Sequence, residues 1–422
     1  MEKLRTLMRH TIIYGVLHGL EAVVPFLFLV LLTQYLSPSE FGVWSLFASL
    51  YAATIPLIGG RLDDAVRMHF GDLGPRRLSR FISSAILLTT FLAILLLLGV
   101  ISFPAFFAHI TQFPERWLWM IIVVAHAYAI FGLLRSIYQF KAQTTPLAIT
   151  LLLQVSLTLI ITAAFLAVGA RYTAAIFGTA GGLVGSILIS ITLFKPSLGI
   201  DFAAKVDRQF LRLLLRFFVI YLPAALGPVL IPLTDRLFIG HIEGLNEVGF
   251  YSIANYFGAA LSTIVAGAFL FAWLPWVFKL LSQNDTKSRH IAYKATVLFY
   301  IGLPVIGLIV WQLSLLIAPY LMTDQFIKAT DYILWLVLAA VAQGYFFHNQ
   351  GFLHHAKRTQ AMSTCTIVAI VLNIVFDYVL IKQYGTIGIA YATVLAYGGA
   401  ALLNGLLAYR TIRRNIPTSH VS

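Results

Sequence analysis

Hydrophobic residues in this sequence fall in long blocks that short polar segments separate. Each block is long enough for an α-helix to cross the hydrocarbon core of a bilayer, which takes about 20 residues. Turn-forming clusters such as Ser37-Pro38-Ser39 mark several of the breaks. The pattern predicts an all-α integral membrane protein. We expect twelve transmembrane helices, at about residues 11–36, 43–66, 79–103, 117–137, 146–169, 173–194, 213–240, 249–280, 292–318, 331–352, 360–381 and 386–409.

One stretch of the chain occurs twice. Residues 9–45 align without a gap with residues 216–252, and seven positions are identical, Glu40 and Glu247 among them. Both copies have a basic residue, an apolar run that contains proline, a short polar loop and a Glu-x-Gly segment that begins the next run. We interpret the shared positions as scaffold and expect function at the positions where the copies differ.

The repeat predicts two halves of similar plan, a six-helix lobe over residues 1–194 and another over residues 213–422. Residues 195–212 form the longest polar connector and are the predicted cytoplasmic linker. Because each half has an even number of helices, both halves enter the membrane in the same direction. This parallel-repeat plan places a substrate path at the interface of two bundles and suggests alternating access.

The charged residues indicate the topology. Hydrophobic residues make up 60% of the chain, charged residues 11%, and the formal net charge is +13. In a membrane protein the excess of Lys and Arg belongs to cytoplasmic segments, so this charge does not point to nucleic acid. With the N-terminus inside, both termini are expected in the cytoplasm, and the outside loops are too short for an extracytoplasmic domain. The outside segments then hold only Arg116, Arg171, Arg236, Lys328 and Lys382 of the 29 Lys and Arg residues.

Signals of enzymatic or cofactor chemistry are weak. Cys365 is the only cysteine, which excludes a disulfide within the chain and a multi-cysteine metal site. Asp63-Asp64 is half of a magnesium-diphosphate motif, but no second aspartate-rich motif accompanies it. Gly178 and Gly182 lie inside an apolar helix, where their spacing favours close helix packing over a phosphate loop. We therefore expect a protein that is not an enzyme, without cofactor or metal.

Glu21 is an acidic residue deep in the first predicted helix, about 18 Å of helix rise beyond Arg9. His18 lies on the same helix face, three residues earlier. An ionisable group inside the bilayer is a candidate for function, here a site that responds to protons or cations. A His–Glu hydrogen bond that only holds the helix face is an equal alternative. The second copy of the repeat has Ala225 and Pro228 at these positions, so the pair is not part of the shared scaffold.

A second set of polar residues lies toward the cytoplasmic ends of several helices. If these side chains face one interior, they form a cationic cavity in which arginine gives bidentate contacts to phosphate oxygens. For each arginine alone, anchoring at the inner membrane surface is the stronger explanation. The predicted substrate-binding set consists of Arg61, Arg67, Arg135, Arg216, His348 and Asn349.

A third set lies on the predicted helices 213–240 and 360–381. Asp235 and Arg236 are adjacent near the outer end of the first, and Asp377 follows Asn373 by four residues on the second. Together with Glu21 and His18, Asp235, Arg236 and Asp377 are the candidates for ion coupling. Asp235 and Arg236 are equally explained as an ion pair at the membrane interface.

Several stretches carry a family resemblance. These are YLSPSEFGVWSL (35–46), LTDRLFIGHIEGLNEVG, the following GFYSIANYFGAALSTIVAGAFLFAWLPWVFK (249–279), and NIVFDYVLIKQYGTIGIAYATVLAY (373–397). They resemble polysaccharide exporters of the multidrug/oligosaccharidyl-lipid/polysaccharide flippase superfamily. The short length and the twelve expected helices resemble an O-antigen or exopolysaccharide repeat-unit flippase of the Wzx type more than a lipid II flippase with added helices.

The resemblance implies twelve helices in two pseudo-symmetric six-helix bundles around a central cavity, a MATE-like architecture. It also implies a flippase that moves an undecaprenyl-diphosphate-linked oligosaccharide from the inner to the outer leaflet of the bacterial cytoplasmic membrane. The expected partners are that glycan, membrane lipids, and the polymerase and chain-length proteins of the same pathway. Two alternatives stay open. One is a polymerase or ligase of that pathway, which the short outside loops disfavour. The other is a drug or cation antiporter of the same superfamily, for which we expect more deep acidic groups and fewer arginines.

Overall fold

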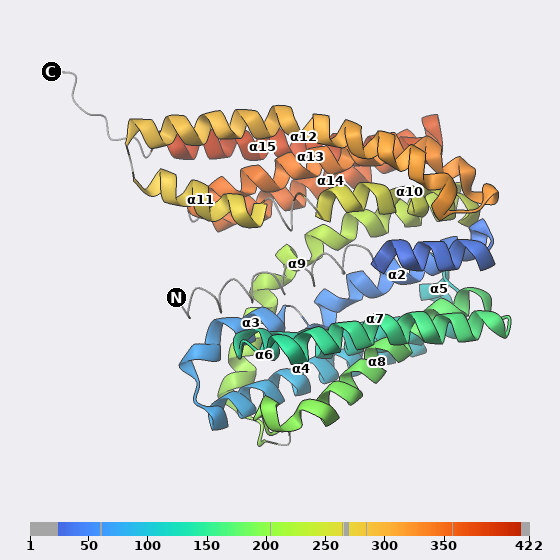
Figure 1. The fold of residues 1–422 in the computed structure, drawn as a ribbon, viewed down its shortest axis with the longest axis vertical. Helices are drawn as coiled ribbons and strands as arrows, with labels where there is room; N and C mark the ends of the chain where they lie inside the picture. Colours follow the sequence, from blue (N-terminus) through green and yellow to red (C-terminus); the bar gives the residue numbers. More distant parts are fainter. Residues whose placement is uncertain are drawn as a thin grey trace. The chain divides into compact units, whose positions relative to one another are not determined.

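The computed structural model describes residues 24–59, 61–202, 204–263, 265, 270–283, 285–356 and 358–414. The chain divides into two compact units, unit 1 (Met1–Leu233) and unit 2 (Thr234–Ser422). Both units are built from α-helices (Figure 1). One long helix, α9 (Arg208–Ile242), begins in unit 1 and ends in unit 2.

Unit 1 contains an apolar helix at Val24–Tyr35 and a series of helices joined by short turns. These are α2 (Pro38–Gly59), α3 (Leu62–His69), α4 (Pro75–Ser102), α5 (Pro104–Thr111), α6 (Leu118–Phe140), α7 (Thr144–Ala167) and α8 (Arg171–Leu198), with 3-10 turns η1 (Phe70–Asp72) and η2 (Glu115–Trp117). Unit 2 contains α10 (Leu245–Thr263), α11 (Leu270–Ser282), α12 (Thr286–Leu321), η4 (Asp324–Ala329), α13 (Thr330–His355), α14 (Thr359–Tyr384) and α15 (Thr386–Arg414).

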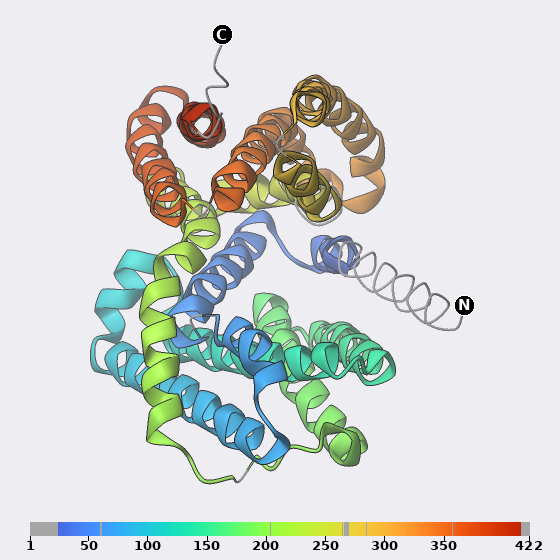
Figure 2. The same ribbon diagram turned by 90° about the vertical axis from the view of Figure 1, so that its left-hand side faces the viewer.

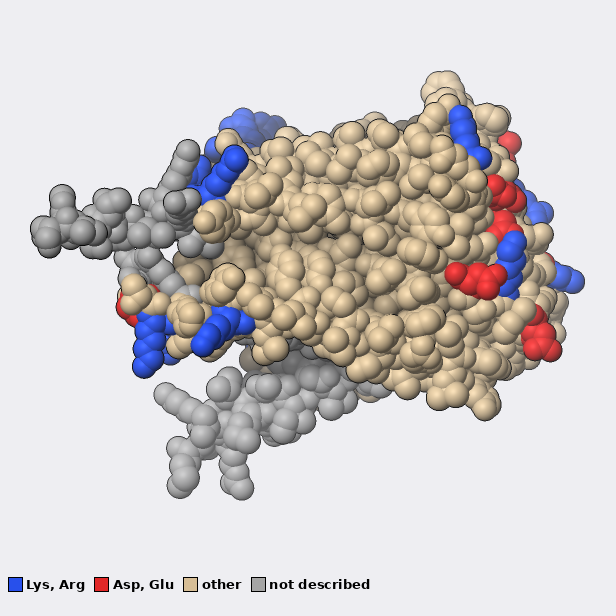
Figure 3. Space-filling view, turned by 90° about the horizontal axis from the view of Figure 1, so that it is seen from above, with Lys and Arg blue, Asp and Glu red and all other residues tan. Residues whose placement is uncertain are grey.

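The membrane prediction is confirmed. Ten helices within the described residues are long and apolar enough to cross a bilayer. They correspond to all predicted helices except two. The predicted helix 11–36 is described only from residue 24 onward, and the predicted helix 249–280 is described as α10 and α11. On the face that Figure 3 shows, Lys, Arg, Asp and Glu lie at the two ends, and the surface between them is uncharged.

The predicted helix 43–66 is wrong in its second half. Helix α2 ends at Gly59, Arg61 adopts a left-handed backbone conformation with φ of 61°, and α3 begins at Leu62. A side chain at positive φ interrupts a right-handed helix and allows the chain to change direction. The short α3 buries Leu62 and turns its charged residues to the opposite side.

The helices also extend into the predicted linker 195–212 from both sides. Helix α8 continues to Leu198, α9 begins at Arg208, and residues 199–207 connect them. Gly199 ends α8 in the left-handed conformation that favours glycine at this position. The ammonium group of Lys141 donates a hydrogen bond to the carbonyl of Leu198 and so satisfies a free C=O at the end of α8.

Helices α7 and α8 are neighbours in unit 1 (Figure 1). The two predicted packing glycines face α7, where a Cβ atom on Gly178 would lie 1.8 Å from Thr162 Oγ1 and one on Gly182 would lie 2.0 Å from Thr158 Oγ1. Only a residue without a Cβ atom permits so close an approach of two helices. In unit 2, α14 and α15 form a comparable neighbouring pair (Figure 2).

The two copies of the repeated glutamate occupy equivalent places in the two units. Glu40 Oε1 lies 3.0 Å from Arg171 Nη1 at the start of α8, and Glu40 Oε2 accepts a 2.9 Å hydrogen bond from the backbone of Ser37. Glu247 pairs with Lys328 and accepts a 2.7 Å hydrogen bond from the hydroxyl of Tyr332. Each glutamate thus ties the start of its own helix to another helix of the same unit.

Candidate functional site

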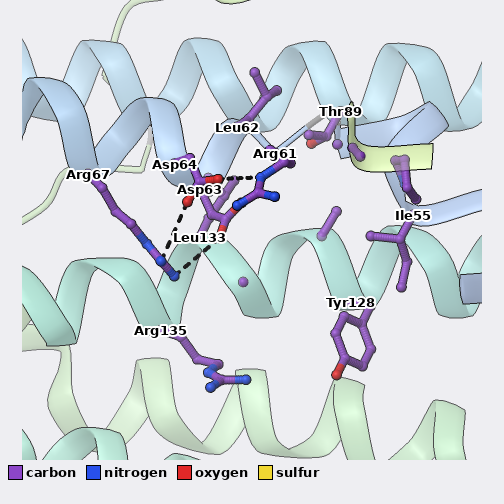
Figure 4. Close-up of a pocket in the computed structure, with 15 residues that line it drawn as sticks. Ile55, Arg61, Leu62, Asp63, Asp64, Arg67, Thr89, Tyr128, Leu133 and Arg135 are labelled. Atoms are coloured by element: carbon purple, nitrogen blue, oxygen red, sulfur yellow. Dashed lines mark hydrogen bonds and ion pairs between the residues drawn. The ribbon is translucent and has the colours of Figure 1, made fainter. Parts of the chain in front are cut away.

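Unit 1 contains a cavity of about 390 Å³ where α2 and α3 meet α6 (Figure 4). Its polar wall includes three of the predicted substrate-binding residues. The charged lining residues are Arg61, Asp63, Asp64, Arg67 and Arg135. The remaining lining residues are Ile55, Pro56, Gly59, Leu62, Thr89, Tyr128, Ala129, Gly132, Leu133 and Ala225.

The short helix α3 carries three of the charged groups, and Arg61 directly precedes it. Arg67 follows Asp63 by four residues and Asp64 by three, so the three side chains share one helix face. Arg67 Nη2 lies 3.3 Å from Asp63 Oδ2, and Arg67 Nη1 lies 3.4 Å from Asp64 Oδ1. Arg61, at the left-handed position before α3, pairs through its Nε atom with Asp64 Oδ2.

Helix α6 forms the opposite wall and is held close to α3. Arg67 Nε donates a 3.3 Å hydrogen bond to Ser136 Oγ. A Cβ atom on Gly132 would lie 3.9 Å from Asp63 Cβ, so the two helices come close to each other at this point. The guanidinium carbon of Arg135 lies 5.9 Å from the ring centroid of Phe131 on the same helix.

The cavity is less cationic than the sequence predicts. Three arginines face two aspartates in the lining, so a single formal positive charge remains. Burial raises the pKa of Asp63, the negative charge of Asp64 raises it further, and Arg67 and Arg61 act in the opposite direction. The sequence pattern identified the arginines. It did not show that the neighbouring carboxylates of Asp63 and Asp64 form ion pairs with Arg61 and Arg67.

The other predicted substrate-binding residues lie elsewhere. Arg216 is exposed on α9 and does not line this cavity. His348 and Asn349 lie on α13 in unit 2, where they are buried among helices. The structure therefore groups Arg61, Arg67 and Arg135 in one cavity of unit 1, and the substrate-binding role of all six residues stays a prediction.

His348 lies in an aromatic cluster. Its ring stacks on Phe299 with centroids 4.5 Å apart and planes 12° apart, and Trp273 lies 5.4 Å away. The side chain is 0% exposed, and neither ring nitrogen has a hydrogen-bond partner within the described part of the chain. Asn349 accepts a 2.7 Å hydrogen bond from Tyr300 and donates one of 2.9 Å to the carbonyl of Ala401.

A second polar cluster is buried in unit 2, among α9, α10, α14 and α15. Asp235 Oδ2 accepts hydrogen bonds from the hydroxyl of Tyr251 at 2.7 Å and from that of Thr393 at 3.1 Å. Asp235 Oδ1 accepts one of 3.1 Å from the amide of Asn373. Four helices thus converge on one carboxylate that is only 3% exposed.

The second acid of this cluster is Asp377. Its Oδ1 atom lies 3.3 Å from the amide nitrogen of Asn373, and its Oδ2 atom is buried without a hydrogen-bond partner among the described residues. The carbonyl oxygen of Asn373 in turn accepts a 2.9 Å hydrogen bond from Thr234. Two carboxylates and the hydroxyl groups of Tyr251 and Thr393 give a set of oxygen atoms suited to a proton or a hard cation.

Arg236 points to a different group. Its side chain is also buried, and its Nε atom donates a 3.1 Å hydrogen bond to Ser252 Oγ on α10. The adjacent residues Asp235 and Arg236 are both buried inside unit 2.

The sequence pattern placed Asp235, Asn373 and Asp377 in one set of polar residues but did not predict that they contact each other. It gave no indication of Tyr251 and Thr393. Both missed residues lie in the stretches that carry the family resemblance, 249–279 and 373–397. Their hydroxyl groups gave no signal in the hydropathy pattern. His18 and Glu21, the first pair proposed for ion coupling, lie outside the described residues.

Among the residues that the structure describes, no three or more His, Cys, Asp and Glu side chains are grouped so that they could hold a metal ion. Cys365 is buried.

Comparison with known families gives two matches. The family model described as "Polysaccharide biosynthesis protein" matches residues 7–281, which is more than half of the chain. The model described as "MatE" matches residues 224–379. No curated protein sequence matches.

Comparison with solved structures supports the predicted architecture. A multidrug resistance MATE family transporter of the MOP superfamily, in an inward-facing conformation, matches with a TM-score of 0.73 at 15% identity, over 94% of this chain and 96% of that chain. The lipid II flippase MurJ, in an inward closed conformation, matches with a TM-score of 0.73 at 15% identity, over 97% and 94%. A point mutant of the Vibrio cholerae MATE transporter VcmN matches with a TM-score of 0.60 at 13% identity, over 98% of both chains. The chain therefore has a MATE-like fold.

Proposed function

The chain belongs to the polysaccharide biosynthesis protein family, and from this we propose that it is a flippase for a polyprenyl-diphosphate-linked oligosaccharide. The proposed substrate is an O-antigen or exopolysaccharide repeat unit on undecaprenyl diphosphate. It moves from the inner to the outer leaflet of the bacterial cytoplasmic membrane, with both termini of the protein in the cytoplasm. The predicted lobes, residues 1–194 and 213–422, alternate access by moving against each other.

The observation that carries this proposal is the arginine-lined cavity of unit 1. Its volume of about 390 Å³ falls in the range of roughly 300–1,000 Å³ that is common for small-molecule sites. Guanidinium groups bind phosphate oxygens with two parallel hydrogen bonds, and Arg61, Arg67 and Arg135 reach this cavity from α3 and α6. The apolar lining, with Tyr128 and Leu133, provides surface against which a sugar ring packs.

Coupling to an ion gradient is the second part of the proposal. Asp235 and Asp377 are two acids buried in the membrane region of unit 2, and Asp377 keeps one oxygen without a described partner. A buried acid is costly unless it has a function or a full set of partners. We assign this cluster to the coupling proton or cation. His18 and Glu21 are the equivalent candidates in the first half of the chain.

Depletion of the protein in its native cell tests the function directly. Lipid-linked repeat units that accumulate on the inner leaflet would support flipping. Repeat units that accumulate unpolymerised on the outer leaflet would instead indicate a polymerase or ligase of the same pathway. In the depleted strain, the variants Arg67→Ala and Arg135→Ala should export less glycan at unchanged protein level. Arg116→Ala, which changes an arginine outside the cavity, is the matched control.

A drug or cation antiporter of the same superfamily is the second candidate. Two observations favour it, the "MatE" match over residues 224–379 and the pair of buried acids Asp235 and Asp377. This candidate predicts normal surface glycan and impaired drug efflux after depletion, the reverse of the result expected for the flippase.

A further inference from the structure

The aspartates Asp63 and Asp64 line the cavity beside the arginines. We propose that these two carboxylates are internal competitors that occupy Arg61 and Arg67 when the cavity is empty and that the diphosphate of the substrate displaces them. This inference rests on the proposed function, and it concerns how the same site binds and releases its ligand.

The geometry places both carboxylates on the guanidinium groups that a phosphate would use. Arg67 presents one Nη atom to each aspartate, at 3.3 Å and 3.4 Å, and Arg61 presents Nε to Asp64. Figure 4 shows that Asp64 bridges Arg61 and Arg67 and that Asp63 contacts Arg67 as well. Two carboxylates on two arginines resemble the two linked phosphates of a diphosphate in charge.

The contacts are weak enough to exchange. The side chains of Arg61 and Arg67 are 53% and 40% exposed, and those of Asp63 and Asp64 are 32% and 22% exposed. Ion pairs at such exposure contribute little to stability, because water competes for both partners. A diphosphate carries more charge than a single carboxylate and offers more acceptor oxygens to the two arginines, so it displaces the aspartates.

The competition gives a transporter a specific advantage. An arginine cavity without counter-anions would hold the diphosphate tightly in every conformation, and uniformly tight binding slows release without helping translocation. Carboxylates that return to the arginines lower the affinity and speed release. They also favour ligands with several negative charges over singly charged anions, since only the former replace both carboxylates.

Arg67 keeps its position during the exchange. Its Nε atom is held by Ser136 on α6, while its two Nη atoms face the aspartates. The part of the guanidinium group that is fixed and the part that changes partner are therefore different atoms.

Titration calorimetry on the purified full-length protein with inorganic pyrophosphate tests the proposal. We compare the wild type with Asp63→Asn, Asp64→Asn and the double variant. Each amide keeps the shape of the side chain but loses the charge, so the double variant should bind pyrophosphate about tenfold more tightly. In vesicles, the same variant should transport lipid-linked glycan more slowly, because release is slowed.

Asp72→Asn is the matched control. Asp72 is an exposed aspartate in η1, close in sequence, and no ion pair within the described chain involves it. If Asp72→Asn tightened binding as much as the double variant, general charge and not the ion pairs would set the affinity, and the proposal would be overturned. Unchanged affinity in the aspartate variants would overturn it as well.

The test separates this inference from the function it rests on. If neither the wild type nor any variant bound pyrophosphate, the proposal that this cavity binds the diphosphate of the substrate would be wrong. If the wild type bound pyrophosphate and the variants bound it with the same affinity, only the proposed competition by Asp63 and Asp64 would be wrong. Should the double variant fail to fold, the two single variants decide the question, with an expected gain of about threefold each.

Discussion

The side-chain amide of Asn373 lies 3.1 Å from Oδ1 of Asp235 and so joins α14 to α9 inside unit 2. The same nitrogen lies 3.3 Å from Oδ1 of Asp377, one helical turn further along α14. One neutral donor therefore serves two acids that would otherwise face each other in a region with little water. Bilayer-embedded acids are rare and mark ion pathways, which is why this cluster has the central place in the coupling proposal.

Replacement of Asp235 by Asn should uncouple transport from the ion gradient. The amide cannot accept from Tyr251, Thr393 and Asn373 as a carboxylate does, and it carries no charge for a cation to neutralise. Loss of charge-assisted hydrogen bonds of roughly 1.5–3 kcal/mol corresponds to a fall in coupled transport of about tenfold or more. Glycan export from vesicles with and without an imposed gradient measures this. Asp331→Asn, an exposed aspartate in the first turn of α13, should leave export unchanged. Gradient-dependent export that survives in Asp235→Asn would contradict the coupling role.

The contact between α7 and α8 gives a prediction about stability. In Gly182→Ala, the new Cβ atom would lie 2.0 Å from Thr158 Oγ1 and 2.8 Å from the backbone nitrogen of the same residue. Because backbone atoms are among those that must move, we expect a loss of about 1–3 kcal/mol and a lower thermal unfolding temperature. Gly99→Ala on α4 is the control, since its Cβ atom would meet nothing within 4 Å. An unfolding temperature that Gly182→Ala leaves unchanged would show that the two helices can separate without cost.

The membrane helices could be predicted from the sequence and the cavity could not. Helices α13 and α14 correspond to the predicted helices 331–352 and 360–381. The prediction succeeds because the thickness of a bilayer fixes both the length and the hydrophobicity of such helices. Helix α3 escaped prediction since LDDAVRMH is short and polar, and the hydropathy of 43–66 obscured the break at Arg61.

The hydropathy pattern also could not predict which side chains the individual polar residues contact. The hydropathy pattern gave no sign that α6 would lie against Asp63 at Gly132. Likewise, Tyr251 and Thr393 come from helices distant in the sequence, and only tertiary packing brings them to Asp235.

The pKa of Asp63 predicts how pyrophosphate binding depends on pH. Burial and then the charge of Asp64 raise this pKa above the ordinary value of 3.8, although Arg67 and Arg61 partly offset the effect, and Arg135 is the charged group on α6 that lines the same cavity. As pH falls from neutral through the raised pKa, Asp63 is protonated, Arg67 loses one carboxylate partner, and binding should tighten. Pyrophosphate itself also takes up protons, so the quantity to measure is the affinity ratio of wild type to Asp63→Asn. The ratio should approach one on the acidic side.

The same shift has a consequence for stability. A raised folded-state pKa means that the folded protein binds this proton more tightly than the unfolded chain. The contribution of Asp63 to stability is therefore present at low pH and lost as pH rises through the folded pKa. We compare the thermal unfolding temperatures of the wild type and Asp63→Asn at several pH values above 3.8. The unfolding temperature of the wild type should fall relative to that of the variant as pH rises. A constant difference across that window would be inconsistent with a raised pKa.

Arg67 should be the most sensitive arginine of the cavity, and its geometry should matter as much as its charge. Its guanidinium group contacts Asp63, Asp64 and Ser136 with different nitrogen atoms, and lysine cannot reproduce these contacts because its ammonium group is a single point charge. Arg67→Lys should therefore weaken pyrophosphate binding by about tenfold, the equivalent of one charge-assisted hydrogen bond of roughly 1.5 kcal/mol. Titration calorimetry on the purified protein measures the change. Arg76→Lys is the matched control, because Arg76 is exposed at the start of α4 and does not line the cavity. If Arg67→Lys bound pyrophosphate as tightly as the wild type, positive charge alone would suffice, and the bidentate contact proposed for this arginine would be wrong.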